Sequence, residues 1–233
     1  MRMKISMFKY TFFAVQVLVS LAFVNTAQAN LGLKEYINST LSTKVANVTL
    51  KGDGSIKISV TMSEAEPVVG ESPMDKGMAF IHAHSEIFGD LGSADIQVSS
   101  MKSRSDGAAS LVFERRLSGI ILNHWRVVIR LNPVGSVTYF SANIYEPNAE
   151  QINAAGSVGQ ISLNDVEEIV KADLASRLDV SSSAYQAAID NLLFKKKIIK
   201  SAPYVIWDGG SSYLYKIDAI TGDIISSHQN IMH

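Results

Sequence analysis

The sequence predicts an α+β protein built of two successive modules, each with a helix packed on an antiparallel β-sheet. Some segments alternate apolar and polar residues, as half-buried strands do, and two longer segments have a helical period. Their order supports the same conclusion, because a helical segment followed by strand segments occurs twice along the chain. With 47% hydrophobic and 18% charged residues, the chain has enough apolar side chains for a packed core.

Residues 1–29 have the layout of a secretory signal peptide. Three basic residues open the segment, a mostly apolar run follows at residues 10–24, and Ala27-Gln28-Ala29 forms a cleavage site. The run is shorter than the roughly 20 residues that a membrane-spanning helix needs. We therefore expect cleavage after Ala29, no stable membrane anchor afterwards, and export to the periplasm or the extracellular space. The mature chain keeps 18 of the 21 basic residues against 22 acidic ones, a net charge of −4.

The N-terminal segment, residues 30–74, is predicted to contain a β-hairpin. Residues 45–50 and 56–60 alternate apolar and polar side chains, and the glycines of Lys51-Gly52-Asp53-Gly54 between them permit a tight turn. We expect this hairpin, residues 45–60, to add strands to the sheet of the first module.

Residues 75–147 form the first predicted module. Apolar residues recur at helical spacing over residues 75–91, and Gly89 is a plausible end of that helix. The alternation that follows predicts strands at residues 111–117, 125–131 and 137–145.

The second predicted module, residues 161–233, repeats this order after a linker of small residues at 148–160. Ser162 is the expected N-cap of its helix, with Asp165 as the third helical residue. The expected strands lie at residues 192–199, 204–207, 213–217 and 224–225.

Missing residue types and motifs exclude several functional classes. Without cysteine, disulfides, thiol catalysis and cysteine-ligated metal sites are impossible. A net charge of −1 gives no basic surface of the kind that nucleic acid requires. The motifs of zinc proteases, serine hydrolases, P-loop proteins and dinucleotide-binding proteins do not occur in the chain. We expect no enzymatic activity, no cofactor, no metal ion and no nucleic-acid partner.

The histidines do not form a recognisable metal site. His82 and His84 would point about 200° apart on a helix, so they cannot both bind one ion. His84 lies between Phe80 and Phe88 in the helical pattern and is expected to be packed. His124 is expected at the surface of a strand edge.

Lys195-Lys196-Lys197 is a run of cations within an expected strand. We interpret it as a charged edge strand that discourages the addition of further strands. Contact with an acidic partner is the alternative.

The motifs of both modules resemble a known pair of domains. Residues 79–89, 111–122 and 125–131 resemble the helix and first strands of the fungalysin/thermolysin propeptide (FTP) motif. Residues 161–166 and 213–225 resemble a PepSY domain, with Asp218-Ala219-Ile220-Thr221-Gly222 as the most specific part. The implied fold is cystatin-like or PepSY-like in each module, and Asp218 and Gly222 are expected to serve a turn.

In this family the two modules form the pro-region of secreted thermolysin-like zinc metalloproteases, where they assist folding of the protease and inhibit it. The present sequence departs from that plan in two ways. It stops at His233, where the protease domain would begin, and Asn123-His124 replaces the usual second glycine of the first module. The resemblance therefore implies a stand-alone, propeptide-like protein that binds a secreted thermolysin-like metalloprotease in trans, as inhibitor, folding chaperone or both.

Two parts of the chain are the candidate contacts with that partner. The first is the segment from Gly119 to Trp125, and the second is the C-terminal tail, residues 226–233, whose histidines are candidates to reach a partner's zinc. The candidate residues are Gly119, Ile120, Ile121, Leu122, His124, Trp125, His228, Asn230 and His233.

Two alternatives stay open. PepSY-type domains also occur outside proteases, so the protein could be a periplasmic or envelope binding or assembly module with no protease partner. It could also be the remnant of a truncated pro-enzyme.

Overall fold

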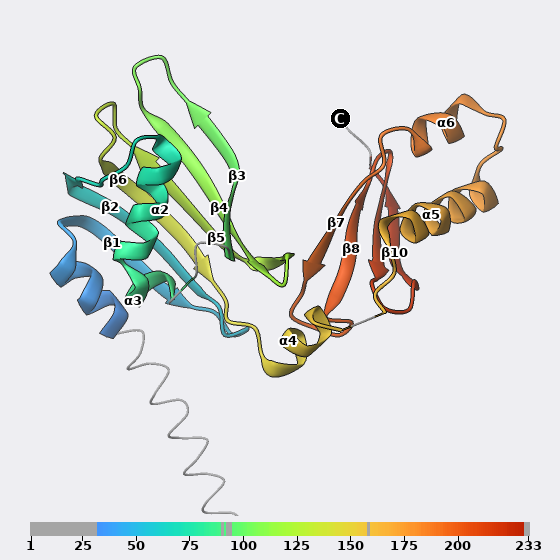
Figure 1. Ribbon diagram of the computed structural model, residues 1–233, viewed down its shortest axis with the longest axis horizontal. Helices are drawn as coiled ribbons and strands as arrows, with labels where there is room; N and C mark the ends of the chain where they lie inside the picture. Colours follow the sequence, from blue (N-terminus) through green and yellow to red (C-terminus); the bar gives the residue numbers. More distant parts are fainter. Residues whose placement is uncertain (1–31, 90, 92–94, 158, 231–233) are drawn as a thin grey trace, which may run out of the picture. The chain divides into compact units, whose positions relative to one another are not determined.

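The computed structural model describes residues 32–89, 91, 95–157 and 159–230 (Figure 1). The predicted signal peptide and His233 lie outside these residues. Residues 32–40 form the first helix. The following elements are β1 (Thr43–Leu50), β2 (Ile56–Glu66), α2 (Pro73–Ala83), α3 (Ser85–Phe88), β3 (Ile96–Ser103), β4 (Ala109–Leu117), β5 (Ile120–Leu131), β6 (Val137–Ile144), α4 (Ala149–Ala155), α5 (Leu163–Arg177), α6 (Ser183–Ile189), β7 (Leu193–Ile198), β8 (Val205–Gly210), β9 (Tyr213–Asp218) and β10 (Ile224–Gln229).

The mixture of helices with a mostly antiparallel sheet confirms the α+β class. Hydrogen-bonded strands follow the order β1-β2-β6-β5-β7-β8-β9-β10, and β4 joins β5 to β3 beside this path. The β5–β7 pairing is parallel and short, whereas β7 to β10 form an antiparallel meander. Among the described residues, every helix is too short or too polar to cross a membrane.

The predicted N-terminal hairpin is confirmed. Strands β1 and β2 are antiparallel, with Ala46 opposite Val60 and Leu50 opposite Ile56. The Asp53 carboxylate accepts the backbone N–H of Ser55 at 2.9 Å, which stabilises the turn between them. Because β2 neighbours β6, the hairpin extends the sheet as expected.

Contacts within the chain define two compact units. Of the described residues, the first unit takes 32–89, 101–111 and 128–142, and the second takes 91, 95–100, 112–127, 143–157 and 159–230. In the first unit, aromatic rings join α2 and α3 to the sheet. The Phe140 ring of β6 lies 5.4 Å from the Phe80 ring and 5.5 Å from the Phe88 ring, all three fully buried.

The single helix predicted at residues 75–91 is two helices in the structure. His84 ends α2 and begins α3 with a backbone φ of −120° and ψ of 49°, which is not helical. Gly89 follows α3 at φ +91°, which agrees with its expected role as the end of the helical segment. The prediction that His84 is packed is confirmed: it is 5% exposed, and its Nε2 lies 2.7 Å from Glu66 Oε1.

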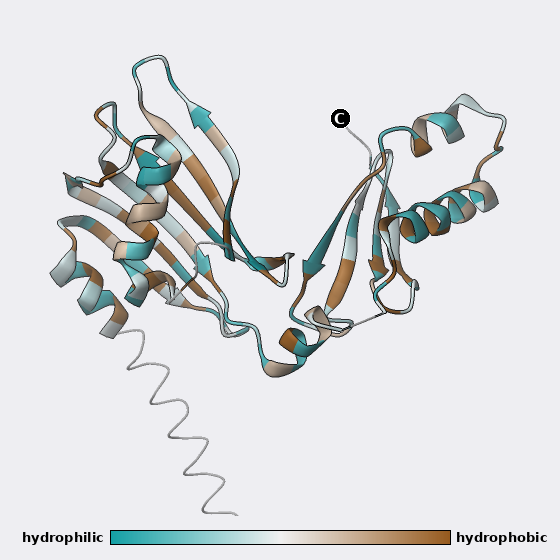
Figure 2. Cartoon of the chain, viewed as in Figure 1, coloured by the Kyte–Doolittle hydropathy of each residue, from teal (hydrophilic) through white to brown (hydrophobic). Residues whose placement is uncertain are grey.

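In the second unit, helix α5 begins as the sequence predicted. The Ser162 hydroxyl accepts the backbone N–H of Asp165, whose carboxylate accepts the backbone N–H of Ser162 in return. Three apolar residues of α5 are fully buried: Val166, Val170 and Leu174. Figure 2 shows hydrophobic and hydrophilic residues alternating around this helix.

The turn between β9 and β10 also agrees with the sequence prediction. The Asp218 carboxylate accepts the backbone N–H groups of Ile220 and Thr221, at 2.7 and 3.3 Å. Gly222 has a φ of +81°, which a residue with a side chain rarely adopts. Asp218 and Gly222 thus shape the turn.

Four elements were not predicted: the helix at residues 32–40, strand β3, and helices α4 and α6. Helix α4 lies within the segment that the sequence predicted to be a linker. The small residues of that segment are compatible with a helix, and Asn148 caps it. Its Gln151 is fully buried and donates to the carbonyl of Ile199 at 2.6 Å, which attaches α4 to the chain after β7.

Candidate functional site

The first candidate contact segment begins at a tight turn between β4 and β5. Ser118 and Gly119 have φ values of +50° and +79°, as expected for a two-residue hairpin connection. Gly119 is exposed, and the Arg116 side chain donates to its carbonyl at 2.8 Å. The turn is therefore an accessible part of the predicted segment.

The apolar candidates that follow are buried. Ile120 and Ile121 are each 6% exposed, and Leu122 and Trp125 are each 1% exposed. Three consecutive buried residues indicate that β5 is covered on both faces here. A partner would reach these side chains only where they line a cavity.

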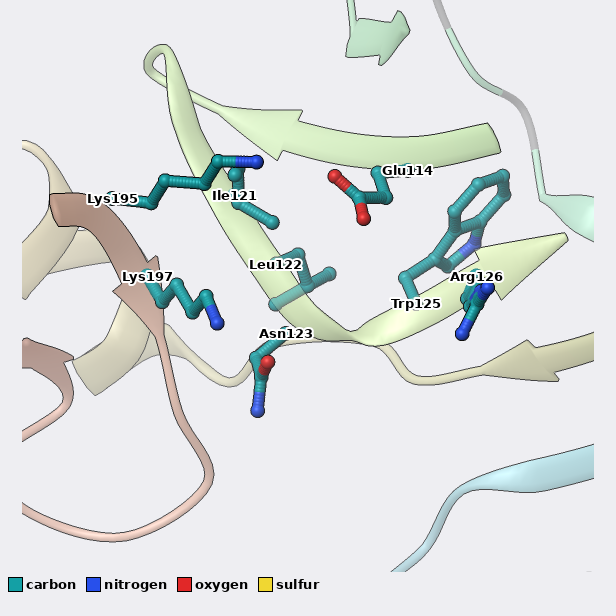
Figure 3. A pocket seen from close by; sticks show the side chains of 8 residues that line it. All are labelled: Glu114, Ile121, Leu122, Asn123, Trp125, Arg126, Lys195 and Lys197. Atoms are coloured by element: carbon teal, nitrogen blue, oxygen red, sulfur yellow. The ribbon is translucent and has the colours of Figure 1, made fainter. Parts of the chain in front are cut away.

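Such a cavity exists in the second unit, with a volume of about 190 Å³ (Figure 3). Three predicted candidates, Ile121, Leu122 and Trp125, form part of its wall. Sequence reasoning did not assign the five polar residues beside them to a common site. These are Glu114, Asn123, Arg126, Lys195 and Lys197. We call these eight residues the β5–β7 pocket.

Strand β7 brings two lysines of the cationic run to this pocket. Ile121 pairs with Lys197 in the parallel β5–β7 ladder, and β8 pairs with β7 on its other side. The interpretation of the run as an edge strand is therefore wrong: backbone pairing over a large sequence separation places β7 inside the strand order. In Figure 3, the Lys195 and Glu114 side chains extend from β7 and β4 toward the middle of the pocket.

Alternation along β7 gives its middle lysine a different environment. Lys196 lies over the Trp207 ring at 4.7 Å and donates to Gln160 Oε1 at 2.9 Å. Burial lowers the pKa of Lys196 below its usual range. Lys197 forms an ion pair with Asp208 at 2.5 Å. Lys195 is thus the exposed cation of the run at the pocket.

Trp125 lines the pocket but does not offer it an accessible donor. Its indole Nε1 is buried and has no hydrogen-bond partner among the described residues. Because almost none of that nitrogen is exposed, a group in the pocket cannot form a hydrogen bond with it. The donors that a partner can reach belong to the exposed side chains of the lining, Asn123, Arg126 and Lys195.

His124 differs from its predicted setting. It lies in the middle of β5, half-buried, and its ring meets the Tyr145 ring edge-on at 6.1 Å. The expectation of a surface residue at a strand edge is therefore wrong, because β6 runs beside β5. Asn143 of β6 donates to the His124 carbonyl at 2.5 Å.

The C-terminal candidates lie on an ordered strand rather than in a free tail. His228 is in β10 opposite Leu214 of β9, and the Asn230 backbone N–H donates to the Ser212 carbonyl at 2.7 Å. The interpretation of residues 226–230 as a tail is wrong, because these residues extend the meander. His233 lies outside the described residues.

The described residues contain no group of three or more histidines and carboxylates positioned to hold a metal ion. The β5–β7 pocket combines charged groups and an amide with an apolar wall. Such a lining can bind and orient a polar group by hydrogen bonds and charge.

Neither protein-family models nor curated protein sequences give a match to this chain.

Proposed function

We propose that the mature protein is an exported, propeptide-like protein that binds a thermolysin-like zinc metalloprotease in trans and inhibits it or assists its folding. The observation that carries the proposal is the Asp218–Gly222 turn in its strand–turn–strand setting. This segment is the most specific part of the PepSY resemblance, and its carboxylate and positive-φ glycine have the roles that such a turn needs.

The helix-on-sheet contacts of the second unit support the same proposal. Helix α5 and strand β9 are joined by Tyr215, whose hydroxyl donates to Asp173 Oδ2 at 2.8 Å. Arg177 of the same helix donates to Ser227 Oγ of β10 at 2.9 Å, so α5 contacts two strands of the meander, as we would expect of a helix-on-sheet module of the PepSY type. The packing of α2 on β6 through Phe80 and Phe140 is the corresponding contact for an FTP-like module.

Strand β10 offers a surface for a protein partner. It is the last strand in the order, so its outer edge has no neighbouring strand in the part of the chain that the structure describes. In antiparallel strands, N–H groups alternate between the neighbour and the free edge. Because the Asn230 N–H points to Ser212, the N–H of Gln229 points outward. An extended segment of a protease could add to this edge.

The β5–β7 pocket provides a second, polar contact. The exposed side chains of Lys195 and Asn123 would donate hydrogen bonds to oxygen atoms of the partner. A stable complex buries about 1,200–2,000 Å² in total, so the edge strand and the pocket would each supply part of the interface.

The test is inhibition of a purified thermolysin-like metalloprotease from the same source by residues 30–233. We expect saturable inhibition that is weakened by Gln229→Pro, because proline removes the outward N–H without removing a bond to β9. Gln229→Ala is the matched control, since it removes the side chain but keeps the N–H. It should inhibit like the wild type.

Inhibition that is equally strong in the proline variant would place the contact away from β10. If the protein neither inhibits nor binds the protease, and does not assist its refolding, the protease proposal is wrong. An envelope module without a protease partner would then be the better hypothesis.

A further inference from the structure

A second pocket, with a volume of about 370 Å³, lies in the first unit at one end of strands β3 to β6. Two turns meet near this end: a Cβ atom on Gly107 of the β3–β4 turn would lie 3.1 Å from the Pro133 carbonyl of the β5–β6 turn. We call it the strand-end pocket. Its lining residues are Lys102, Arg104, Ala108, Ala109, Ser110, Arg130, Leu131 and Thr138.

All charged side chains that line the strand-end pocket are basic. Three of the eight residues are cations and none is acidic. Arg104 pairs with Asp106 at 3.1 Å, but Lys102 and Arg130 make no ion pair with any carboxylate of the described residues. In a chain of net charge −1, this is a local excess of positive charge. A concave surface lined by one sign of charge attracts ligands of the opposite sign.

Arg130 is held ready to bind an oxyanion. Its guanidinium carbon lies 4.7 Å from the centre of the Tyr139 ring, and the Tyr139 hydroxyl lies 3.4 Å from Ser59 Oγ. Stacking fixes the plane of a guanidinium while its N–H edge stays free for a two-point bond to carboxylate or phosphate. Less side-chain entropy is then lost when the anion binds.

A hydroxyl and an apolar wall complete the strand-end pocket. The Ser110 hydroxyl has no hydrogen-bond partner in the described part of the chain, so it is a free donor. Ala108 and Thr138 are partly exposed and give the wall its accessible apolar part, whereas Ala109 and Leu131 belong to the buried face of the sheet. The volume exceeds what an inorganic anion needs and lies within the usual range for small-molecule sites, about 300–1,000 Å³.

We propose that the strand-end pocket binds a small organic oxyanion, with its carboxylate or phosphate on Arg130, Lys102 and Ser110 and its apolar body against Ala108 and the Thr138 methyl group. This site is independent of the protease proposal, because none of its residues belongs to β10 or to the β5–β7 pocket.

The test is a calorimetric titration of the folded protein at low salt with benzoate, phenyl phosphate and the neutral analogue benzamide. We expect saturable binding of at least one anion and none of benzamide. The anion that binds more tightly identifies the preferred head group. Arg130→Gln and Lys102→Gln should each weaken binding about tenfold, which corresponds to one charge-assisted hydrogen bond.

Lys44→Gln is the matched control for Lys102→Gln, because Lys44 is an exposed lysine of β1 in the same unit that lines neither pocket and makes no hydrogen bond or ion pair in the described structure. It should leave anion binding unchanged. Lys102→Gln removes no hydrogen bond or ion pair of the described structure, so a loss of binding in this variant is not a loss of folding. Equal binding of benzamide and benzoate, equal effects of Lys44→Gln and Lys102→Gln, or no binding of either anion at millimolar concentration would overturn the proposal.

Discussion

At the scale of single residues, a buried tyrosine belongs to a hydrogen-bond network that joins three elements of the second unit, α5, β9 and β10. Tyr215 of β9 is 1% exposed, and its hydroxyl donates to Asp173 of α5 at 2.8 Å. Arg177 donates to Asp173 Oδ1 and to Ser227 Oγ of β10, each at 2.9 Å. Burial first, and then the hydrogen bond to Asp173 and its negative charge, raise the pKa of Tyr215 above its usual range.

We predict that Tyr215→Phe lowers the free energy of unfolding by about 1–2 kcal/mol at pH 7, because Asp173 loses a hydrogen-bond donor in a buried site. The pKa of Tyr215 is raised in the folded state, so its stabilising effect is complete below pH 10 and is lost as the pH rises further. The difference between the two proteins should therefore shrink above pH 10. Urea unfolding at pH 7, 9 and 10.5 measures it.

Tyr213→Phe is the matched control for this experiment. Tyr213 lies on the same strand, half-exposed, and makes no side-chain hydrogen bond in the described structure. Its substitution should change stability by less than about 0.5 kcal/mol. Equal losses in the two variants would mean that the Asp173 hydrogen bond is not the stabilising interaction.

At the scale of elements, helices α2 and α5 begin with the same motif. Ser72 and Asp75 form a reciprocal capping box at α2, as Ser162 and Asp165 do at α5. The hydrogen bonds from each serine lower the pKa of the paired aspartate below its usual range. The sequence analysis predicted only the second box, although both share the spacing Ser-x-x-Asp.

We predict that Ser162→Ala destabilises the protein by about 1 kcal/mol at pH 7, the usual effect of losing an N-cap. The pKa of Asp165 should rise toward its ordinary value, which an NMR titration of its carboxyl group measures. Because the folded-state pKa is lowered, the stabilisation is present above the unfolded pKa near 4 and is lost as the pH falls. The difference in stability between the two proteins should therefore become smaller at low pH, where only the bond from the Asp165 N–H to the Ser162 hydroxyl remains.

Ser183→Ala serves as the control for the cap. Ser183 is an exposed first residue of α6, and its side chain makes no hydrogen bond in the described structure. It should leave stability almost unchanged. A Ser162→Ala variant as stable as wild type at pH 7 would show that the capping box does not stabilise α5.

At the scale of the whole molecule, the sequence predicts two forms of the chain, before and after export. Expression in a bacterial host that exports the protein should give a mature chain that begins at Asn30, because Ala27-Gln28-Ala29 fits signal peptidase cleavage. Intact mass and N-terminal sequencing of the periplasmic and extracellular fractions measure this. A protein that keeps residues 1–29 and stays with the membrane would contradict it.

The sequence by itself determined those features that depend on neighbouring residues. The period of apolar positions predicted the β1–β2 hairpin and helix α5, and local hydrogen bonding predicted the Ser162 cap and the Asp218 turn. Each of these depends on residues only a few positions apart, so propensity and spacing are sufficient. The two-helix form of residues 75–91 was missed because the nonhelical backbone of His84 accompanies a tertiary contact of its ring with Glu66 of β2.

Only the tertiary structure decided where distant segments meet. The β5–β7 pocket exists because Ile121 pairs with Lys197, and no local pattern encodes that parallel pairing across 76 positions. The same holds for the strand-end pocket, where Lys102 and Arg130 converge from different strands. Spacing along one strand could have shown that Lys195 and Lys197 share a face, but not what lies opposite them. The sequence thus determined those elements and turns that have a strong local signal, whereas long-range strand pairing, stabilised by burial of a common core, decided the candidate sites.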